Sequence, residues 1–426
     1  MNILIKNCLI IDTNSNHNNK QKDILIINGR FEKISNKIDI SNYKNVKTVD
    51  FKSKNLHVSP GWFDMHVDFG EPGNEQKETI KSGSEAAKKG GFTGVLLSPN
   101  TNPNIDNSST VKYIKQFNSN SIVDILPSGN ITLKNKGEKI VEMHDMSKAG
   151  CVAFTDDKQS LQNSNVLKIA LLYVKDSNKL IMNYPNDHSL SKNGLINEGM
   201  VSTSLGLKGI PRVAEEVMTN RDIKLCEYTN SRMHLSYIST QECTEIIKQA
   251  KKNKINITAD VCIYNLIYND QQLKDFNTNF KLLPPLRDKT DINSLIKALK
   301  LNIIDVITSD HRPHLDDDKN KEFEHAKFGI IGLESFFGLL CKNLLGKLSI
   351  NEIVDKISIN PRKILNINCP VIEIGKKANI TLFDPNINWN FSKSSIKSKS
   401  FNTPFVSQKL QGKALAIYNN KKYHQC

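Results

Sequence analysis

Two short segments carry most of the side chains that could bind a metal ion or move protons. His66 and Asp68 are two residues apart in the first, so both would lie on the same side of a strand. The second, S-D-H-R-P-H at 309–314, places one carboxyl group and two imidazoles directly after an apolar segment. Such groups bind divalent metals and act as acid–base catalysts. A lone His-x-Asp pair is common by chance, and the second segment is the more specific signal.

A pair of carboxyl groups, Asp156 and Asp157, follows a third apolar segment. One of the two could face a reaction site and bind a metal ion. The structural alternative is a solvated turn or the N-cap of a helix, where Asp is common. The same alternative applies to Asp310, but the two imidazoles beside it favour a reactive site there.

These segments fit the strand ends of a parallel barrel. Short apolar segments alternate with longer helical patterns, which is typical of parallel strands joined by crossover helices. Eight such units close an α/β fold, the (β/α)8 TIM-type barrel, whose reactive groups lie at the C-terminal ends of its strands. The predicted strands are 63–67, 93–98, 122–127, 151–155, 180–183, 233–236, 256–260 and 305–309, and the predicted helices include 77–89, 166–175, 211–226, 240–253 and 291–301.

The two ends of the chain are predicted to be β instead. Near the N-terminus, a strand pattern at 24–27 ends at Asn28-Gly29, a hairpin turn signal. Near the C-terminus, strand patterns recur at 372–375, 379–383 and 414–418. Neither end alone has enough strands for independent stability. We therefore expect one small composite β-sandwich domain of residues 1–56 and 366–426, beside a barrel of residues 57–365.

The composition narrows the class of protein. The 426 residues are 38% hydrophobic, and no apolar run approaches the roughly 20 residues of a membrane span. The start lacks a signal-peptide pattern, and the eight cysteines are scattered without a C-x-x-C pair, so we expect a cytoplasmic protein with reduced thiols. The net charge of +14 is spread over the chain with no basic-aromatic block. Specific nucleic-acid binding is therefore not expected.

In their order along the chain, the motifs resemble those of dihydroorotases, which are cyclic amidohydrolases of the amidohydrolase superfamily. The resemblance covers essentially the whole chain. It rests on P-G-W-F-D-M-H-V-D at 60–68, E-P-G at 71–73, G-G-F-T at 90–93, P-N-T-N-P at 99–103, A-F-T-D-D at 153–157, H-L-S-Y-I-S-T at 234–240, P-P-L-R at 284–287, S-D-H-R-P-H at 309–314 and F-G-I-I-G-L-E at 328–334.

The resemblance implies a role in pyrimidine (UMP) biosynthesis. Dihydroorotases interconvert N-carbamoyl-L-aspartate and L-dihydroorotate with zinc-activated water, while an Asp carries the proton. By the match, Asp310 resembles the acid–base residue, and the candidate metal ligands are His66, Asp68 and Asp156. Substrate-binding residues are implied at Asn100, His314, Phe328 and Gly329. A homo-oligomer is also expected.

The chain departs from the family pattern at several places in the expected site. Asp68 replaces the second His of a His-x-His pair. Gly70 stands where an Arg would hold the substrate's carboxylate, and Asn183 and Tyr237 stand where His ligands are expected. Leu283 replaces an Asn. The remaining ligands are mostly oxygen donors, which suit at most one weakly held ion better than two zinc ions, and an empty pocket is equally compatible with them.

Two hypotheses follow. The chain is a dihydroorotase with reduced or altered activity, or it is a non-catalytic relative that serves as a partner or scaffold for aspartate transcarbamoylase. Retained Asp310, Asn100 and His314 favour the enzyme. The simultaneous loss of two imidazole ligands and the Arg clamp favours the scaffold. Action on a hydantoin or ureide is a third possibility, because barrel loops change substrate readily. It is the weaker one, since no hydantoinase-like lysine ligand is evident on the fourth strand.

Overall fold

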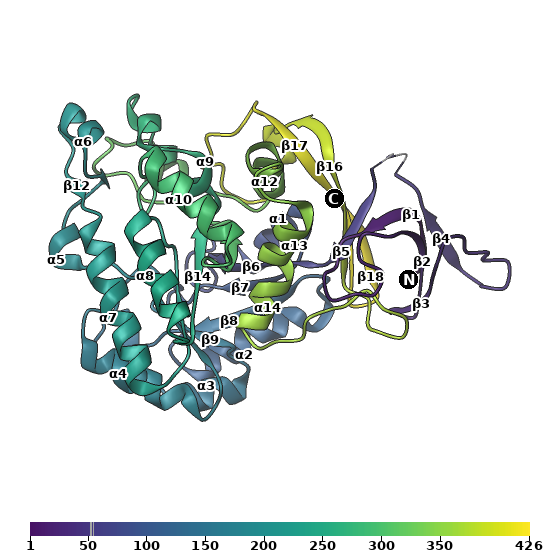
Figure 1. Ribbon diagram of the computed structural model, residues 1–426, viewed down its shortest axis with the longest axis horizontal. Helices are drawn as coiled ribbons and strands as arrows, with labels where there is room; N and C mark the ends of the chain where they lie inside the picture. Colours follow the sequence, from purple (N-terminus) through teal and green to yellow (C-terminus); the bar gives the residue numbers. More distant parts are fainter. Residues whose placement is uncertain (52, 54) are drawn as a thin grey trace.

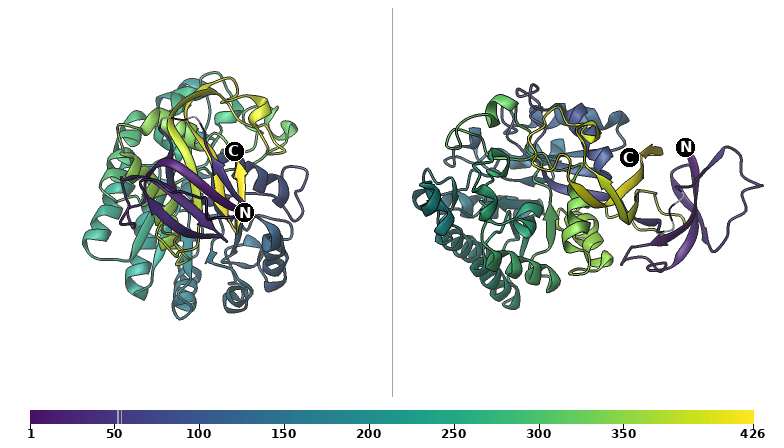
Figure 2. Two further views of the ribbon diagram at one scale, coloured as in Figure 1. Left: turned by 90° about the vertical axis from the view of Figure 1, so that its right-hand side faces the viewer. Right: turned by 90° about the horizontal axis from the view of Figure 1, so that it is seen from above.

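The eight central strands form one parallel sheet that curls into a barrel (Figures 1 and 2). The structure is a computed structural model that describes residues 1–51, 53 and 55–426. The barrel strands, in spatial order, are β6 Trp62–Val67, β7 Phe92–Leu97, β8 Asp124–Gly129, β9 Ala153–Phe154, β10 Leu180–Asn183, β13 Met233–Leu235, β14 Ile257–Cys262 and β15 Val306–Thr308. A bridge between Val67 and His311 joins the last strand to the first. The predicted TIM-type barrel is confirmed.

Helices cover the outside of the barrel (Figure 1). The five predicted helices are present as α1 Ile80–Gly90, α4 Ser164–Lys175, α7 Val213–Thr229, α8 Gln241–Lys252 and α10 Lys289–Lys300. The longer of the others are α2 Ser108–Gln116, α3 Met143–Ala149, α6 Met200–Leu205 and α12 Phe336–Leu344. Short helices are α5 His188–Ser191, α9 Ile263–Ile267, α11 Asp316–Lys319, α13 Ile350–Val354, α14 Asn360–Ile364, η1 Phe117–Asn120, η2 Leu133–Asn135, η3 Asp270–Leu273, η4 Thr278–Phe280, η5 Asp355–Ile359 and η6 Lys393–Ser395.

Both ends of the chain build a second β unit beside the barrel (Figure 1, right). The strand β5 joins the ends because it pairs with β1 in parallel and with β16 antiparallel. The unit consists of one hydrogen-bonded mixed sheet, with β1 Asn2–Ile10, β2 Gln21–Ile27, β3 Arg30–Ser35, β4 Val46–Val49, β5 His57–Pro60, β16 Ile380–Asn390, β17 Lys409–Asn419 and β18 Lys422–Gln425. A two-strand pair, β11 Ile196–Asn197 and β12 Gly209–Ile210, lies apart.

The composite origin of this unit was predicted from the two ends of the chain. The hairpin signal is also confirmed, since Asn28 and Gly29 have φ angles of 51° and 84° between β2 and β3. The sheet includes β5, four residues beyond the predicted boundary at 56. The division of the chain into domains of 1–56 plus 366–426 and 57–365 stays a prediction. No helix within the described residues has the length and apolar character needed to cross a bilayer.

The indole of Trp62 packs where the barrel meets the terminal sheet. Trp62 is fully buried and begins β6. Its ring lies 4.4 Å from that of Phe337 on α12 and 5.5 Å from that of Phe383 on β16, measured between centroids. The indole N–H donates to the Ser59 hydroxyl on β5 at 3.1 Å. One aromatic side chain thus holds the two units together.

The Trp62→Ala variant should lower the free energy of unfolding by about 3–5 kcal/mol, the usual cost of removing a fully buried aromatic side chain. Urea unfolding followed by circular dichroism measures this change. Tyr228→Ala is the matched control, because Tyr228 is 77% exposed and its loss should change stability by no more than about 0.5 kcal/mol. Equal midpoints for the two variants would contradict the bridging role of Trp62.

Candidate functional site

The chemistry-bearing side chains meet at the mouth of the barrel, where the carboxyl ends of its strands converge. Residues at or just after β6, β9, β13, β14 and β15 contribute to it. Three of them, Asp157, Tyr237 and Asp310, have φ angles of 49°, 61° and 47°. Left-handed backbone is uncommon for residues other than glycine and persists where the surroundings hold it in place. Its recurrence at three strand ends marks the mouth as the candidate site.

At the base of the mouth, a buried carboxylate joins two imidazoles. Oδ2 of Asp260 is 2.6 Å from Nε2 of His66 and 2.8 Å from Nε2 of His234. The other oxygen, Oδ1, accepts the backbone N–H of Tyr237 at 2.8 Å. Burial opposes the charge on Asp260, but His66 and His234 outweigh it and hold its pKa below the usual value. Burial likewise opposes protonation of His66, but Asp260 raises the pKa of that imidazole. The three side chains act as a charge-assisted hydrogen-bonded unit.

These three residues are also the one cluster of potential metal ligands within the described residues. A tetrahedral zinc ion with bonds of about 2.0–2.1 Å keeps its ligand atoms about 3.3 Å apart. The observed separations of 2.6 and 2.8 Å are those of hydrogen bonds. A catalytic zinc also needs an open position for water, yet the three side chains are 5%, 0% and 0% exposed. As they lie, these residues do not fit a water-activating zinc site.

Above this cluster, the mouth contains its own cations. Nη2 of Arg312 donates to Oδ2 of Asp157 at 2.6 Å and lies 3.6 Å from Oδ1 of Asp310. Nη1 lies 3.7 Å from Oδ2 of Asp68. Nζ of Lys158 is 2.5 Å from Oδ2 of Asp310. Two side-chain cations are therefore paired with three carboxylates where a divalent ion would need free carboxylates.

Asp157 forms the largest number of polar contacts among these three carboxylates. It also accepts hydrogen bonds from the Tyr237 hydroxyl at 3.1 Å and from the side-chain amide of Asn100. Burial would raise the pKa of Asp157, but Arg312 and Lys158 outweigh burial and lower it to about 2. The ring of Tyr237 packs on that of His66, with centroids 4.2 Å apart. Nζ of Lys158 also lies over the Tyr237 ring, 4.6 Å from its centroid. The aromatic ring thus separates the histidine cluster from the ion pairs.

The structure does not bring Asp156 into the site. Its carboxylate accepts the backbone N–H groups of Ile131 and Thr132, at 2.8 and 3.1 Å, and the Thr132 hydroxyl at 2.5 Å. It therefore fixes the loop after β8, and because Asp156 is buried and caps no helix, neither the solvated turn nor the N-cap considered for this pair describes it. Its neighbour Asp157 faces the mouth instead, because consecutive side chains point in opposite directions. Asp68 lies at the rim beside Arg312 and is not part of the cluster around His66.

The four replaced family positions lie in different places. Tyr237 is central, as described above. Asn183 points away from the mouth and donates to Asp222 on α7 at 2.7 Å. Gly70 has φ of 68°, and a Cβ there would lie 2.8 Å from the carbonyl oxygen of Asn74, so the tight turn excludes a side chain. Leu283 is partly buried against the main core.

The predicted substrate-binding residues line one side of the mouth. Nε2 of His314 is 2.8 Å from the carbonyl oxygen of Phe328, and burial lowers the pKa of this imidazole to about 3. A Cβ on Gly329 would lie 2.9 Å from Arg312 and 3.0 Å from His314. A small opening of about 70 Å³, bounded by Asp68, Gly70 and Asn100 among others, adjoins them. Side chains fill most of the mouth.

Sequence reasoning missed the roles of five residues in this site: Asp157, Lys158, His234, Asp260 and Arg312. Arg312 stands within the motif at 309–314, and Lys158 directly follows the carboxylate pair, so both cations were adjacent to recognised signals. Their reach across the mouth depends on barrel closure, which no local pattern reports. Asp260 ends a predicted strand, and its pairing with His66 joins residues 194 positions apart.

Comparisons with known proteins place the chain among relatives of nearly equal length. The family model described as "Dihydro-orotase-like" matches residues 56–243. The chain is 41% identical over 415 residues to a dihydroorotase from Thermoanaerobacter sp. (strain X514), covering 97% of this chain and 94% of that protein. It is also 41% identical over 424 residues to a dihydroorotase from Caldicellulosiruptor saccharolyticus, covering 98% and 97%.

Solved structures show the same fold at lower identity. An L-hydantoinase from Arthrobacter aurescens superposes with a TM-score of 0.85 at 20% identity, covering 99% of this chain and 95% of that one. A dihydropyrimidinase from Brevibacillus agri gives 0.83 at 19% identity, with the same coverage. These likenesses concern the fold alone.

The ion pair of Asp157 predicts a specific acid sensitivity. Because the folded pKa of Asp157 is about 2, below its unfolded value of 3.8, its contribution is present above pH 4 and is lost as pH falls towards 2. Between pH 5 and 2 the native chain should lose about 2 kcal/mol more stability than Asp157→Asn. Urea unfolding across this range measures the difference. Asp317→Asn, at an exposed carboxylate, is the control, and equal profiles for all three proteins would contradict the assignment.

Proposed function

Because the chain belongs to the dihydroorotase family, we propose that it serves pyrimidine biosynthesis as a dihydroorotase-type protein for N-carbamoyl-L-aspartate and L-dihydroorotate, with its own cyclisation activity reduced or lost. The relatives at 41% identity over nearly the full length support the family role. The observation that supports reduced activity is the occupation of the mouth carboxylates by Arg312 and Lys158.

The reaction requires an activated water and a group that carries a proton to or from the ring nitrogen. A bound zinc would supply the first by lowering the pKa of its water to roughly 7. A metal ion that entered the mouth would be repelled by Arg312 and Lys158, and it would have to displace them from the carboxylates. Asp310, the predicted proton carrier, is paired with Lys158 at 2.5 Å and lies 3.6 Å from Arg312, so both cations must move aside before its carboxylate can accept a proton from the substrate.

The same arrangement supports binding of a carboxylate ligand. Nε of Arg312 has no hydrogen-bond partner within the described residues, although the atom is buried. A guanidinium group that keeps a free N–H can hold a ligand's carboxylate with a charge-assisted bond. Arg312 thus offers a cation that can bind the substrate's carboxylate. By the family resemblance, an Arg at the position of Gly70 would have this role. Asn100 and His314 adjoin it.

Purified protein should hydrolyse L-dihydroorotate at least about a hundredfold more slowly than the Thermoanaerobacter relative assayed beside it, with zinc or with manganese, since several metal-binding groups are replaced or paired. Loss of the residual rate in Asp310→Ala would assign that rate to this mouth. The proposal of reduced activity fails if the protein matches the relative under either metal.

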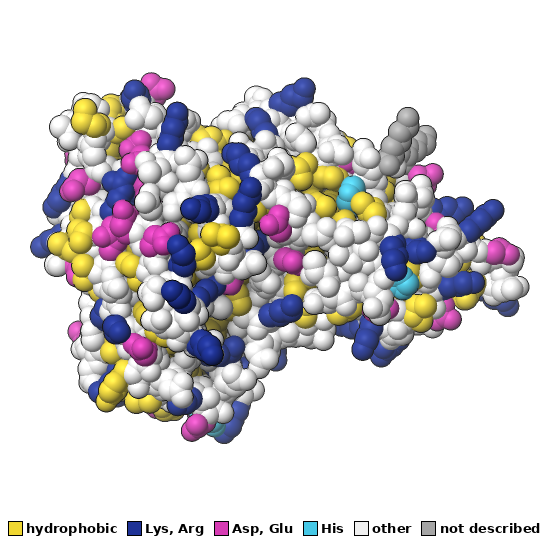
Figure 3. Space-filling view, in the orientation of Figure 1, with side chains coloured by type: hydrophobic (Ala, Val, Ile, Leu, Met, Phe, Trp, Pro, Cys, Tyr) yellow, Lys and Arg dark blue, Asp and Glu magenta, His cyan; other side chains and the backbone are white. Residues whose placement is uncertain are grey.

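A non-catalytic partner of aspartate transcarbamoylase is the second candidate, favoured by the outer face of α4 and α7. Ile169, Leu172 and Tyr173 on α4 are 38–48% exposed, and Val217 and Tyr228 on α7 are 46% and 77% exposed. The two helices lie side by side on the barrel (Figure 1), and apolar side chains are scattered over the left of the molecule in Figure 3. Exposed apolar side chains on adjacent helices are typical of an interaction surface.

Co-expression with aspartate transcarbamoylase from the same organism should yield a complex by size-exclusion chromatography with light scattering. Leu172→Asp with Tyr228→Asp should dissociate it, because each change buries a charge at the interface. Leu301→Asp is the matched control, since Leu301 is 57% exposed on another helix end. A native chain that elutes alone at micromolar concentration contradicts this candidate, and its mass then reports whether it is a homo-oligomer.

A further inference from the structure

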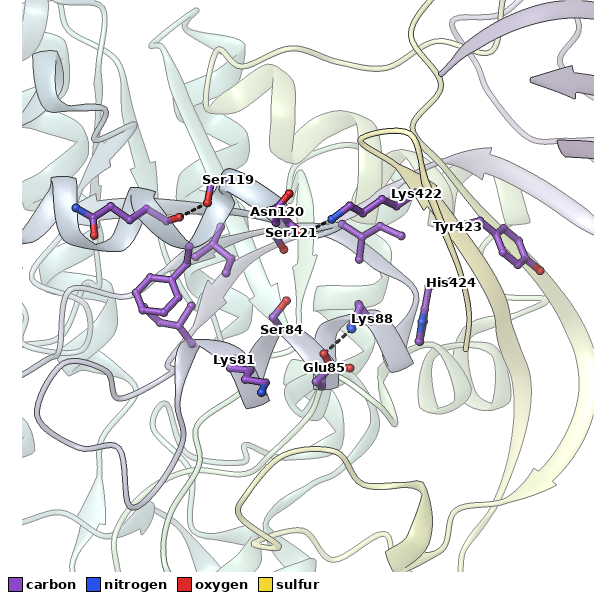
Figure 4. A pocket seen from close by; sticks show the side chains of 15 residues that line it. Lys81, Ser84, Glu85, Lys88, Ser119, Asn120, Ser121, Lys422, Tyr423 and His424 are labelled. Atoms are coloured by element: carbon purple, nitrogen blue, oxygen red, sulfur yellow. Dashed lines mark hydrogen bonds and ion pairs between the residues drawn. The ribbon is translucent and has the colours of Figure 1, made fainter. Parts of the chain in front are cut away.

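A groove lies between the barrel and the terminal sheet, away from the mouth (Figure 4). Its volume is about 590 Å³, against about 70 Å³ for the opening at the mouth. Helix α1 forms one side, and the segment after α2 together with strand β18 forms the other. Pockets for small molecules usually measure about 300–1,000 Å³. This groove is therefore within the usual size range of a pocket for a small metabolite.

The charged side chains around the groove are mostly cations. Lys81 and Lys88 project from α1, and Lys422 projects from β18. Glu85 is the one acidic side chain among the described residues that line the groove, and it pairs with Lys88 at 2.5 Å. Lys422 donates to a backbone carbonyl, which leaves its charge uncompensated. The groove therefore carries a positive potential that favours an anion.

Lys81, Ser84 and His424 are among the polar side chains at this groove that form no hydrogen bond to another described residue. Figure 4 shows Ser84 on α1, with its side chain directed towards the segment that carries Ser119 and Asn120. Burial lowers the pKa of His424, and Lys88 and Lys89 lower it further. The same charges would attract an anionic group, and free hydroxyl and ammonium groups are suitable donors to its oxygens.

The opposite end of the groove is apolar. Phe117 lies there with Ile80, Ile122 and Ile125. The Phe117 ring is held edge-on by Tyr113, with centroids 5.4 Å apart, so it forms a fixed wall. A ligand that fills the groove would place a flat apolar part against this wall and an anionic part among the lysines.

We propose that this groove binds a small phosphorylated compound with a flat ring, such as a nucleoside monophosphate. The lysines and Ser84 hold the phosphate, while Phe117 and the isoleucines contact the ring. The ligand would bridge α1 and β18 and so connect the barrel to the terminal sheet. The mouth residues take no part in this binding.

Isothermal titration of the full-length protein with the four common ribonucleoside monophosphates, their parent nucleosides and inorganic phosphate tests the proposal. At least one monophosphate should bind. Its parent nucleoside and inorganic phosphate should each bind at least about tenfold more weakly, because each lacks one of the two contact groups. No heat from any monophosphate with folded protein, or equal affinity for the parent nucleoside, overturns the proposal.

Four variants locate the site. Ser84→Phe should abolish binding by filling the groove, and Lys88→Gln with Lys422→Gln should weaken it at least about tenfold. Lys274→Gln, an exposed lysine elsewhere, should leave affinity unchanged. Circular dichroism and the unfolding midpoint check that each variant is folded. Loss of binding in Arg312→Gln with retention in Ser84→Phe would assign the ligand to the mouth and overturn the proposal. Tighter binding of a single-stranded oligonucleotide, unaffected by Ser84→Phe, would also overturn it.

Discussion

The pairing of buried charges inside a low-dielectric mouth is the constraint on which the candidate site depends. Barrel closure brings Asp68, Asp157 and Asp310 close together, and buried carboxylates remain ionised only when opposite charges are near. A metal ion is one way to supply that charge. In this protein Arg312 and Lys158 supply it from the chain itself. The mouth carboxylates are thus paired with cations of the chain before any ligand arrives.

The same constraint explains the arrangement below the ion pairs. Asp260 is buried and would be costly to ionise alone, but two imidazoles donate to it. Tyr237 separates this cluster from the ion pairs above, and its unusual backbone angle is held by the hydrogen bond of its N–H to Asp260. Tyr237, at a position where the resemblance implies a His, therefore belongs to a hydrogen-bonded network with Asp260 and Asp157. The mouth is rebuilt around different pairings, with little empty space left.

The terminal sheet has a second consequence besides stability. Because β5 joins strands from both chain ends, the last strand β18 is carried back against α1 of the barrel. Trp62 fixes the position of the two units through contacts with both. A groove with positive charge forms along that line, built from residues more than 300 positions apart in sequence.

The sequence by itself determined the barrel strands, five of the covering helices, the β character of both ends and the position of the reactive motifs, because these follow from local periodicity and from residue types at strand ends. It also located Asp310, His314 and Asn100 at one mouth. Only the tertiary structure decided which of Asp156 and Asp157 faces inward, and that Arg312 and Lys158 reach across to the carboxylates. Those outcomes depend on side-chain direction and on distances between residues far apart in the chain. Local patterns carry no information about either until the barrel closes.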